Sequence, residues 1–203
     1  MYGMRRQVTT SWLSSVVVIL IMLAGGRIHA QQTAFSSIEL RASVLDNLSN
    51  DDAFFLHWHA GKGVGLSGKT PFYAGNAELG LYYNAYDAIG NDIPSMKALH
   101  MFVGWGYPLQ VKSFTIEPAF RLGNYRMIFN DGSTEFRSEM DESEFSTSIV
   151  LSGKLNLNRS LGIFGEVSRT TVYTYYRLYY NYIGAGVSLR FNTGSAFQGA
   201  LSQ

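Results

Sequence analysis

Apolar and polar residues alternate with a period of two through most of this sequence, and that alternation limits the folds open to the chain. In the stretch YNYIGAGVSLRF near the carboxyl end, Ile183 and Val187 fall on one side of an extended backbone, and Gly184 and Ser188 fall on the other. Successive side chains of a β-strand point to opposite faces, so the pattern predicts strands with one apolar and one polar face.

Eight such stretches are separated by clusters of Gly, Asn, Asp, Ser and Pro, which predict turns. The predicted strands are residues 38–46, 53–66, 71–86, 97–107, 112–128, 143–155, 160–175 and 178–191. Each reaches the roughly 9–11 residues that a tilted strand needs to cross a bilayer. The sequence therefore predicts an all-β fold, an eight-stranded antiparallel up-and-down transmembrane β-barrel.

The connections between these strands alternate in length. Residues 67–70, 108–111 and 156–159 predict tight turns, whereas 87–96 and 129–143 predict long polar loops. Outer-membrane barrels have short periplasmic turns and long external loops, so this alternation favours that architecture.

Composition excludes several classes of protein. The 203 residues carry a net charge of +1, only 15% are charged, and none is cysteine. The chain is therefore predicted to bind no nucleic acid and to form no disulfide or thiolate metal site. No cofactor and no metal site are predicted.

The amino-terminal segment predicts export. Arg5 and Arg6 precede a short apolar run, and Ala30 ends a small-residue cleavage motif before polar residues. This pattern is typical of a signal peptide over residues 1–30, cleaved after Ala30. The barrel is then predicted over residues 31–191, followed by a short periplasmic tail over 192–203.

The two faces of the predicted strands indicate which side meets lipid. In ALHMFVGWGY, residues 98–107, the odd positions from Leu99 to Tyr107 are all bulky and apolar, whereas the even positions carry His100, Phe102 and the glycines. A soluble lipocalin-like barrel would have a charged exterior and a bulky apolar lumen. In this sequence the apolar face is continuous and bulky, and the opposite face carries glycines that fit a narrow interior. The bulky face is therefore predicted to point outward into lipid. The aromatic residues predicted to face lipid are Trp105, Tyr107, Phe114, Phe120 and Phe191.

The opposite face predicts a polar network inside the lumen. The residues assigned to it are His57, His59, Glu78, His100, Glu117, Arg121, Glu166 and Arg190. Buried charges persist when they are paired, which favours a structural network. A metal or catalytic site built from His59, His100 and Glu78 is the alternative, although no diagnostic ligand spacing supports it.

In its signal sequence, its alternating strands and its last strand ending VSLRF, the chain resembles small eight-stranded outer-membrane β-barrel proteins of the OmpA/OmpX-like kind. These include the outer-membrane β-barrel domain proteins of Bacteroidetes-type bacteria. The resemblance covers about residues 38–191 and implies that the barrel-insertion machinery reads Phe191. Some relatives on this scaffold modify lipid A, but a deacylase-like His-x-Ser pair on a late strand is missing, because no histidine follows His100.

These observations predict an integral protein of the bacterial outer membrane, surrounded by its lipid, with a structural or surface-interaction role and no enzymatic activity. The long loops are predicted to offer a surface to an extracellular partner. The alternatives are a lipid-modifying enzyme (a hydrolase or an acyltransferase), a narrow channel, and a soluble lipocalin-like binding barrel.

Overall fold

The structure is a computed structural model that describes residues 34–49, 53–90, 94–130 and 141–193. The predicted signal peptide lies outside these residues, as does the predicted tail beyond residue 193. Among the described residues there is no helix of the length and hydrophobicity that a membrane-spanning helix requires.

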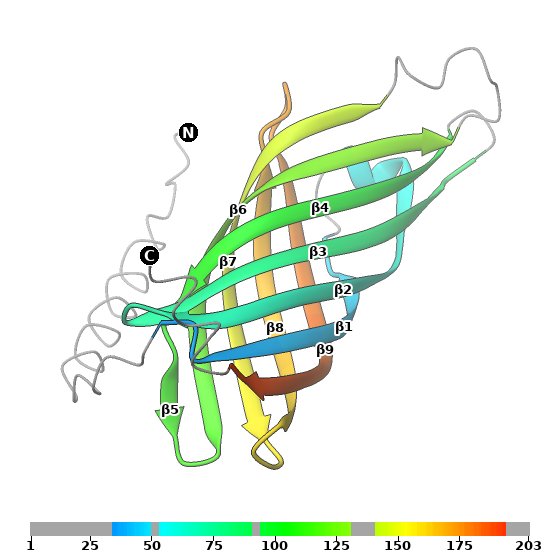
Figure 1. The fold of residues 1–203 in the computed structure, drawn as a ribbon. Helices are drawn as coiled ribbons and strands as arrows, with labels where there is room; N and C mark the ends of the chain where they lie inside the picture. Colours follow the sequence, from blue (N-terminus) through cyan, green and yellow to red (C-terminus); the bar gives the residue numbers. More distant parts are fainter. Residues whose placement is uncertain (1–33, 50–52, 91–93, 131–140, 194–203) are drawn as a thin grey trace, which may run out of the picture. The chain divides into compact units, whose positions relative to one another are not determined.

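Eight long antiparallel strands form one closed barrel, which confirms the predicted fold class (Figure 1). The strands are β1 (Ser37–Asn47), β2 (Trp58–Phe72), β3 (Gly75–Ala88), β4 (Ser95–Gly106), β6 (Phe114–Asn130), β7 (Glu142–Asn156), β8 (Leu161–Val172) and β9 (Leu178–Asn192). Neighbouring strands pair in chain order, β4 pairs with β6, and β9 returns to pair with β1. Each long strand therefore has two partners, and closure satisfies the backbone groups that an open sheet edge would expose.

The first hairpin turn lies later in the chain than predicted. Residues 67–70 were predicted to turn, but β2 continues through them to Phe72, pairing with β1 on one side and β3 on the other. The chain reverses at Tyr73 and Ala74, and Tyr73 has a φ of 53°. The residues of SGKT are common in turns, but here pairing on both sides holds them in the sheet.

Three other predicted boundaries also differ from the structure. Residues 109–111, predicted as part of a turn, form the short strand β5 (Leu109–Val111), which pairs with the start of β6. Figure 1 shows this β5–β6 hairpin projecting at the short-turn end. Residues 53–56, predicted as strand, form the 3₁₀-helix η1 (Ala53–Leu56), and β8 ends at Val172.

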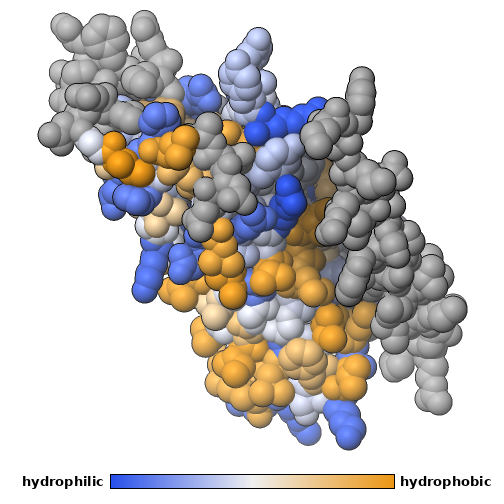
Figure 2. Space-filling model, turned by 180° about the vertical axis from the view of Figure 1, so that it is seen from behind, coloured by the Kyte–Doolittle hydropathy of each residue, from blue (hydrophilic) through white to orange (hydrophobic). Residues whose placement is uncertain are grey.

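The predicted division between outward and inward faces agrees with the burial of the side chains. On β4, Met101, Val103 and Trp105 are exposed, whereas His100 and Phe102 are buried. The other long strands show the same alternation, and Figure 2 shows hydrophobic side chains spread over one outer face of the molecule. An exposed apolar surface of this extent, around a lumen that contains buried charged side chains, is typical of a barrel in lipid.

The interior has two halves along the barrel axis. The half nearest the short turns contains the buried charged side chains. The half nearest the loops contains a buried apolar and aromatic cluster of Tyr86, Met96, Ala98, Tyr125, Met127, Val172, Tyr180 and Tyr182. Because the strands alternate, every one of these side chains points inward without disturbing the apolar outer surface.

Candidate functional site

Arg121 on β6 is the centre of an ion-pair network that crosses the lumen. It forms a bidentate pair with Glu78 of β3: Nε lies 2.9 Å from Oε2, and Nη2 lies 3.0 Å from Oε1. Nη2 also donates to Glu166 Oε2 of β8 at 3.2 Å. The Tyr82 hydroxyl accepts from Arg121 Nη1 at 2.8 Å and donates to Glu166 Oε1 at 2.5 Å. These charge-assisted bonds join strands from opposite parts of the wall.

Aromatic rings hold the same guanidinium from other sides. The Arg121 Cζ atom lies 4.4 Å from the centroid of the Phe102 ring and 5.3 Å from that of Tyr82. Gly80 makes room for this packing, because a Cβ at that position would overlap the Phe102 ring. The cation is therefore both paired and covered, which suits a charge placed out of water.

A second group of ion pairs surrounds Glu39 on β1. Arg41 Nε donates to Glu39 Oε1 at 2.8 Å, and Arg190 Nη2 donates to Oε2 at 3.0 Å. Lys154 Nζ of β7 donates to the same Oε2 atom. Three cations thus share one carboxylate, which links β1, β7 and β9 across the short-turn end.

Lys69 on β2 adds a further link on the other side of the lumen. Its Nζ atom donates to Glu117 of β6 and lies 3.7 Å from Glu78 Oε2. Asn76 Nδ2 donates to the second Glu117 oxygen at 2.7 Å. Glu117 therefore has a partner for each of its oxygens.

The buried charges of this half balance. The carboxylates are Glu39, Glu78, Glu117 and Glu166, and the buried cations are Arg41, Lys69, Arg121 and Lys154, with the partly exposed Arg190 at the rim. Leaving one such charge unpaired in a low-dielectric interior is strongly unfavourable, so the network stabilises the barrel as a unit. Its side chains fill the lumen, as the width of an eight-stranded barrel allows.

Three tyrosines of the buried cluster meet through their hydroxyl groups in the loop-end half. The hydroxyl of Tyr86 lies 3.2 Å from that of Tyr125 and 2.9 Å from that of Tyr182, and the last two lie 3.1 Å apart. Asn47 Nδ2 donates to Tyr86 at 3.3 Å. The hydroxyls satisfy one another at the centre of the lumen, and the rings pack against the wall.

The structure places the residues predicted for the lumen network in three different environments. Glu78, Glu117, Arg121 and Glu166 lie in the linked ion pairs, and Arg190 joins the group around Glu39.

His100 is buried between the two halves. Its Nε2 atom lies 3.0 Å from Ser146 Oγ, and its ring packs beside Phe102 and Tyr125. Because these contacts are with a hydroxyl group and aromatic rings, His100 lies next to the ion-pair network and forms no ion pair within the described residues.

His57 and His59 lie outside the lumen network, which corrects their predicted position. Both are exposed near the loop end. Between Ala60 and Gly63 the β2–β3 register shifts, so that residues 61 and 62 oppose Ala85 alone. Such a bulge reverses the parity of every residue before it, and His59 therefore points outward while Trp58 packs against the inner aromatic cluster.

Four charged residues of the network were not predicted: Glu39, Arg41, Lys69 and Lys154. Lys69 was missed because its segment was read as a turn. The available signal was parity, since Lys69 shares the inward parity of Gly63 and Gly65. A charged residue on the glycine-bearing face of a predicted strand is therefore the feature that identifies this kind of network.

Within the described residues, no three of the His, Asp and Glu side chains are close enough to hold a metal ion. His59 and His100 lie on different faces of the wall, and Glu78 is engaged by Arg121.

The predicted lipid-facing aromatic residues lie at outward positions. Trp105, Phe114, Phe120 and Phe191 are exposed, and Tyr107 is half-buried, 6.4 Å from Trp105 between ring centroids. Phe114 lies near the short-turn end of β6, and Phe191 lies at the corresponding end of β9. Aromatic rings at strand ends suit the boundary between membrane and water.

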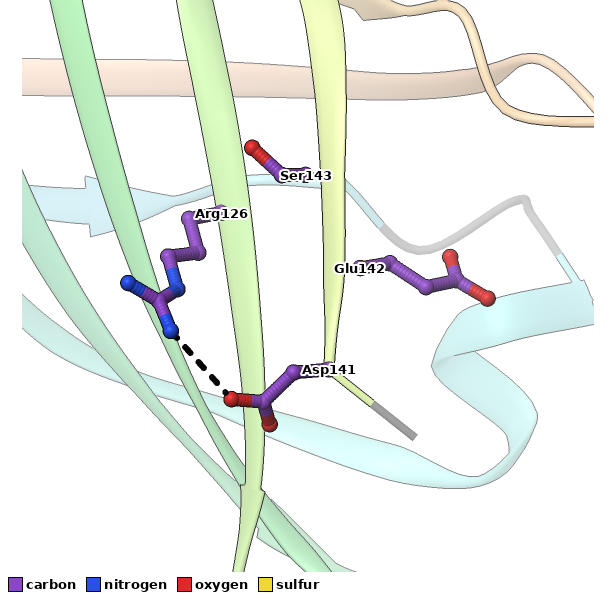
Figure 3. A pocket seen from close by; sticks show the side chains of 4 residues that line it. All are labelled: Arg126, Asp141, Glu142 and Ser143. Atoms are coloured by element: carbon purple, nitrogen blue, oxygen red, sulfur yellow. Dashed lines mark ion pairs between the residues drawn. The ribbon is translucent and has the colours of Figure 1, made fainter. Parts of the chain in front are cut away.

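A shallow pocket of about 370 Å³ lies at the loop end, lined by Arg126, Asp141, Glu142 and Ser143 (Figure 3). Arg126 Nη2 and Asp141 Oδ2 lie 3.5 Å apart, and the arginine side chain is 52% exposed. Exposed pairs of this kind contribute little, about 0–1 kcal/mol. The Arg126–Asp141 pair therefore contributes less to stability than the buried ion pairs of the lumen network.

Comparison with known proteins identifies the fold. No protein-family model and no curated protein matches the chain. The structure is similar to that of Neisserial surface protein A (NspA), with a TM-score of 0.57 and 10% identity over 76% of this chain and 97% of that one. It is also similar to Ail, the attachment invasion locus protein of Yersinia pestis, with a TM-score of 0.50 and 12% identity over 79% of this chain and 100% of that one. The resemblance to proteins of Bacteroidetes-type bacteria stays a prediction. The similarity to these two structures shows that the chain has the fold of small eight-stranded outer-membrane β-barrels.

Proposed function

We propose that this chain is an integral outer-membrane protein whose filled barrel is a non-conducting scaffold with a structural or surface-interaction role. The observation that carries the proposal is the combination of an apolar outer surface with an ion-paired lumen. An apolar outer surface is stable in contact with lipid, whereas buried ion pairs would be unfavourable there. The barrel wall therefore separates the lipid outside from the ion pairs inside. The exposed Phe191 at the end of β9 supports recognition by the insertion machinery.

The filled lumen favours a closed scaffold over a channel. Arg121, Glu78 and Glu166 cross the interior at one level, and the tyrosine hydroxyls meet at another. An ion passing through would have to separate pairs on both levels, each of them buried.

The β8–β9 loop supports a role in extracellular binding. Tyr175 and Tyr176 are 93% and 78% exposed, and Arg177 Cζ lies 5.7 Å from the centroid of the Tyr173 ring. Exposed tyrosine and arginine are the residues that most often dominate binding surfaces. Ail has been solved in complex with the heparin analogue sucrose octasulfate, and we propose that the loops of this chain likewise bind an extracellular partner.

The proposed location and closed lumen predict a specific pair of results. The expressed protein is expected in the outer-membrane fraction, migrating differently on a gel before and after boiling, because a closed barrel stays compact in detergent until heated. In a planar bilayer it should give no conductance above that of the protein-free bilayer. A soluble protein with unchanged migration would contradict the membrane location, and stable single-channel steps would contradict the closed lumen.

The proposal also predicts that the chain does not modify lipid A. Within the described residues, the hydrogen-bonded His–Ser pair is His100 with Ser146, and both are buried inside the lumen, away from lipid. A nucleophile must reach its substrate, so this pair is in the wrong place to act on a membrane lipid. Mass spectrometry of lipid A from a deletion strain is expected to match the parent strain, and a change in acyl-chain number would support the enzymatic alternative.

A further inference from the structure

The outward surface of β7, β8 and β9 changes from apolar to polar near the loop end. These three strands lie side by side in the barrel wall (Figure 1). Val167 of β8 and the residues paired with it on both sides are all bulky and apolar. Two residues nearer the loops, the exposed Arg169 pairs with Ile149 on one side and with Asn181 on the other. Arg169 therefore lies where the apolar band of this part of the wall ends.

Aromatic rings and hydroxyl groups share the outward face between Arg169 and the β8–β9 loop. Tyr179 pairs with Thr171, which in turn pairs with Thr147. Tyr173 follows, with its ring centroid 5.7 Å from that of Phe145 and its hydroxyl 3.3 Å from Thr147 Oγ1. An aromatic ring offers a flat apolar face to the C–H groups of a sugar ring, and a threonine hydroxyl can hydrogen-bond with sugar hydroxyls. This part of the wall has the side chains that a sugar requires.

The positive charge of Arg169 is not matched by a carboxylate of the chain. Arg126, another exposed arginine near the loop end, lies 3.5 Å from Asp141. Among the residues that the structure describes, Arg169 takes part in no ion pair, and its recorded contact is with an aromatic ring. The last acidic residue of the sequence is Glu166, whose carboxylate points into the lumen toward Arg121. The charge of Arg169 is therefore available to an anion outside the chain.

A tyrosine ring holds the Arg169 guanidinium without using its donors. The Cζ atom lies 5.1 Å from the centroid of the Tyr179 ring. A cation–π contact of this kind engages no N–H group, so the edge of the guanidinium can still donate hydrogen bonds. That edge matches two oxygens of a phosphate group.

The position of Arg169 favours the head group of a membrane lipid over a dissolved ligand. Acyl chains contact the apolar row at Val167, and Arg169 lies one outward position beyond that row. The long-loop end of an outer-membrane barrel faces outside, so Arg169 lies on the side of the outer leaflet. Glycolipids of the lipid A type, which form that leaflet, carry their acyl chains on a phosphorylated disaccharide. Such a head group places a phosphate and sugar rings directly beside the acyl chains.

We infer that this outward patch binds the phosphorylated sugar head of one outer-leaflet glycolipid of the lipid A type. The residues of the patch are Thr147, Arg169, Thr171, Tyr173 and Tyr179. Arg169 contacts a phosphate group, the tyrosine rings contact the sugar, and the acyl chains lie along the apolar row. The inference rests on the membrane location proposed above. It concerns the barrel wall rather than the loop tip, and the lipid is bound without being modified.

Native mass spectrometry of the detergent-purified protein measures lipid retention. The probes are lipid A with two phosphates, dephosphorylated lipid A, and phosphatidylglycerol. The parent is expected to retain one molecule of the diphosphorylated lipid A and to prefer it to both other lipids. Arg169→Gln should lower the retained fraction about tenfold, the size expected when one charge-assisted contact is lost. Tyr179→Leu should also weaken retention, because it removes the ring and keeps an apolar side chain.

Arg126→Gln is the matched control. It removes an exposed arginine from the same end of the barrel, but one that already has Asp141 as its partner. Its retained fraction should equal that of the parent. All variants should keep the heat-modifiable migration, since the substituted arginines are exposed. If Arg169→Gln does not, Arg169→Lys replaces it, because lysine keeps the charge but lacks the planar fork and should also weaken retention.

Three outcomes would overturn the inference. Equal retention by the Arg169→Gln and Arg126→Gln variants would show that the patch is not the binding site. Equal retention of lipid A and phosphatidylglycerol by the parent would show a general attraction for anionic lipid. A deacylated, diphosphorylated disaccharide that binds as tightly as lipid A would assign the patch to a dissolved sugar. A chain that never enters the membrane fraction would instead contradict the proposed function, so the two failures are distinguishable.

Discussion

Replacement of Arg121 by methionine is expected to destabilise the folded barrel by about 3–5 kcal/mol, because it leaves buried carboxylates without their shared cation. Among the residues that the structure describes, Glu78 would lose its bidentate partner and keep Lys69 at 3.7 Å, and Glu166 would keep the Tyr82 hydroxyl. The free energy of unfolding can be measured by urea titration in lipid vesicles, with the heat-modifiable fraction as the readout.

Arg126→Met is the matched control for this experiment. It removes the same side chain from the same strand, but Arg126 is exposed and its pair with Asp141 lies at the surface. Its expected effect is about 0–1 kcal/mol. Equal effects of the two variants would contradict the structural role assigned to the lumen network.

The reason for the destabilisation can also be tested. If unpaired charge is the cause, adding Glu78→Gln and Glu166→Gln to Arg121→Met should recover part of the lost stability, because the buried carboxylates are then neutral. If lost packing against Phe102 and Tyr82 is the cause, the triple variant should remain as unstable as the single one.

Much of this architecture could be predicted from the sequence, because side-chain parity in a strand follows from local geometry. Alternation along the strand, together with the assignment of the apolar face to lipid, was enough to predict that Trp105 points outward and Glu78 inward. Parity cannot predict where the rule is interrupted. The β2 bulge at residues 61 and 62 is a property of pairing with Ala85, and it is why His59 was placed on the wrong face.

Partners across the lumen were also beyond local prediction. Arg121 meets Glu78 and Glu166 because the stagger of closed strands sets their heights, and that stagger depends on the whole set of pairings. The group around Glu39 depends further on closure, since it joins β1 to β9 and β7. Sequence parity could identify these residues as inward-facing charges, but only the closed barrel shows which charge binds which.

Closure itself depends on the seam between the first and last strands, where Gly186→Val is expected to prevent it. Gly186 of β9 opposes Ser43 of β1, and a Cβ there would overlap the carbonyl oxygen of Ala42, which is backbone and cannot rotate away. Overpacking of side chains costs about 1–3 kcal/mol, and a backbone clash at the closing seam should cost more. The variant is expected to lose the heat-modifiable band in refolding assays, whereas Gly68→Val, which adds the same atoms where there is room, should keep it. A fully folded Gly186→Val barrel would mean that the seam can shift to accommodate the added side chain, which would contradict the requirement for glycine at this position.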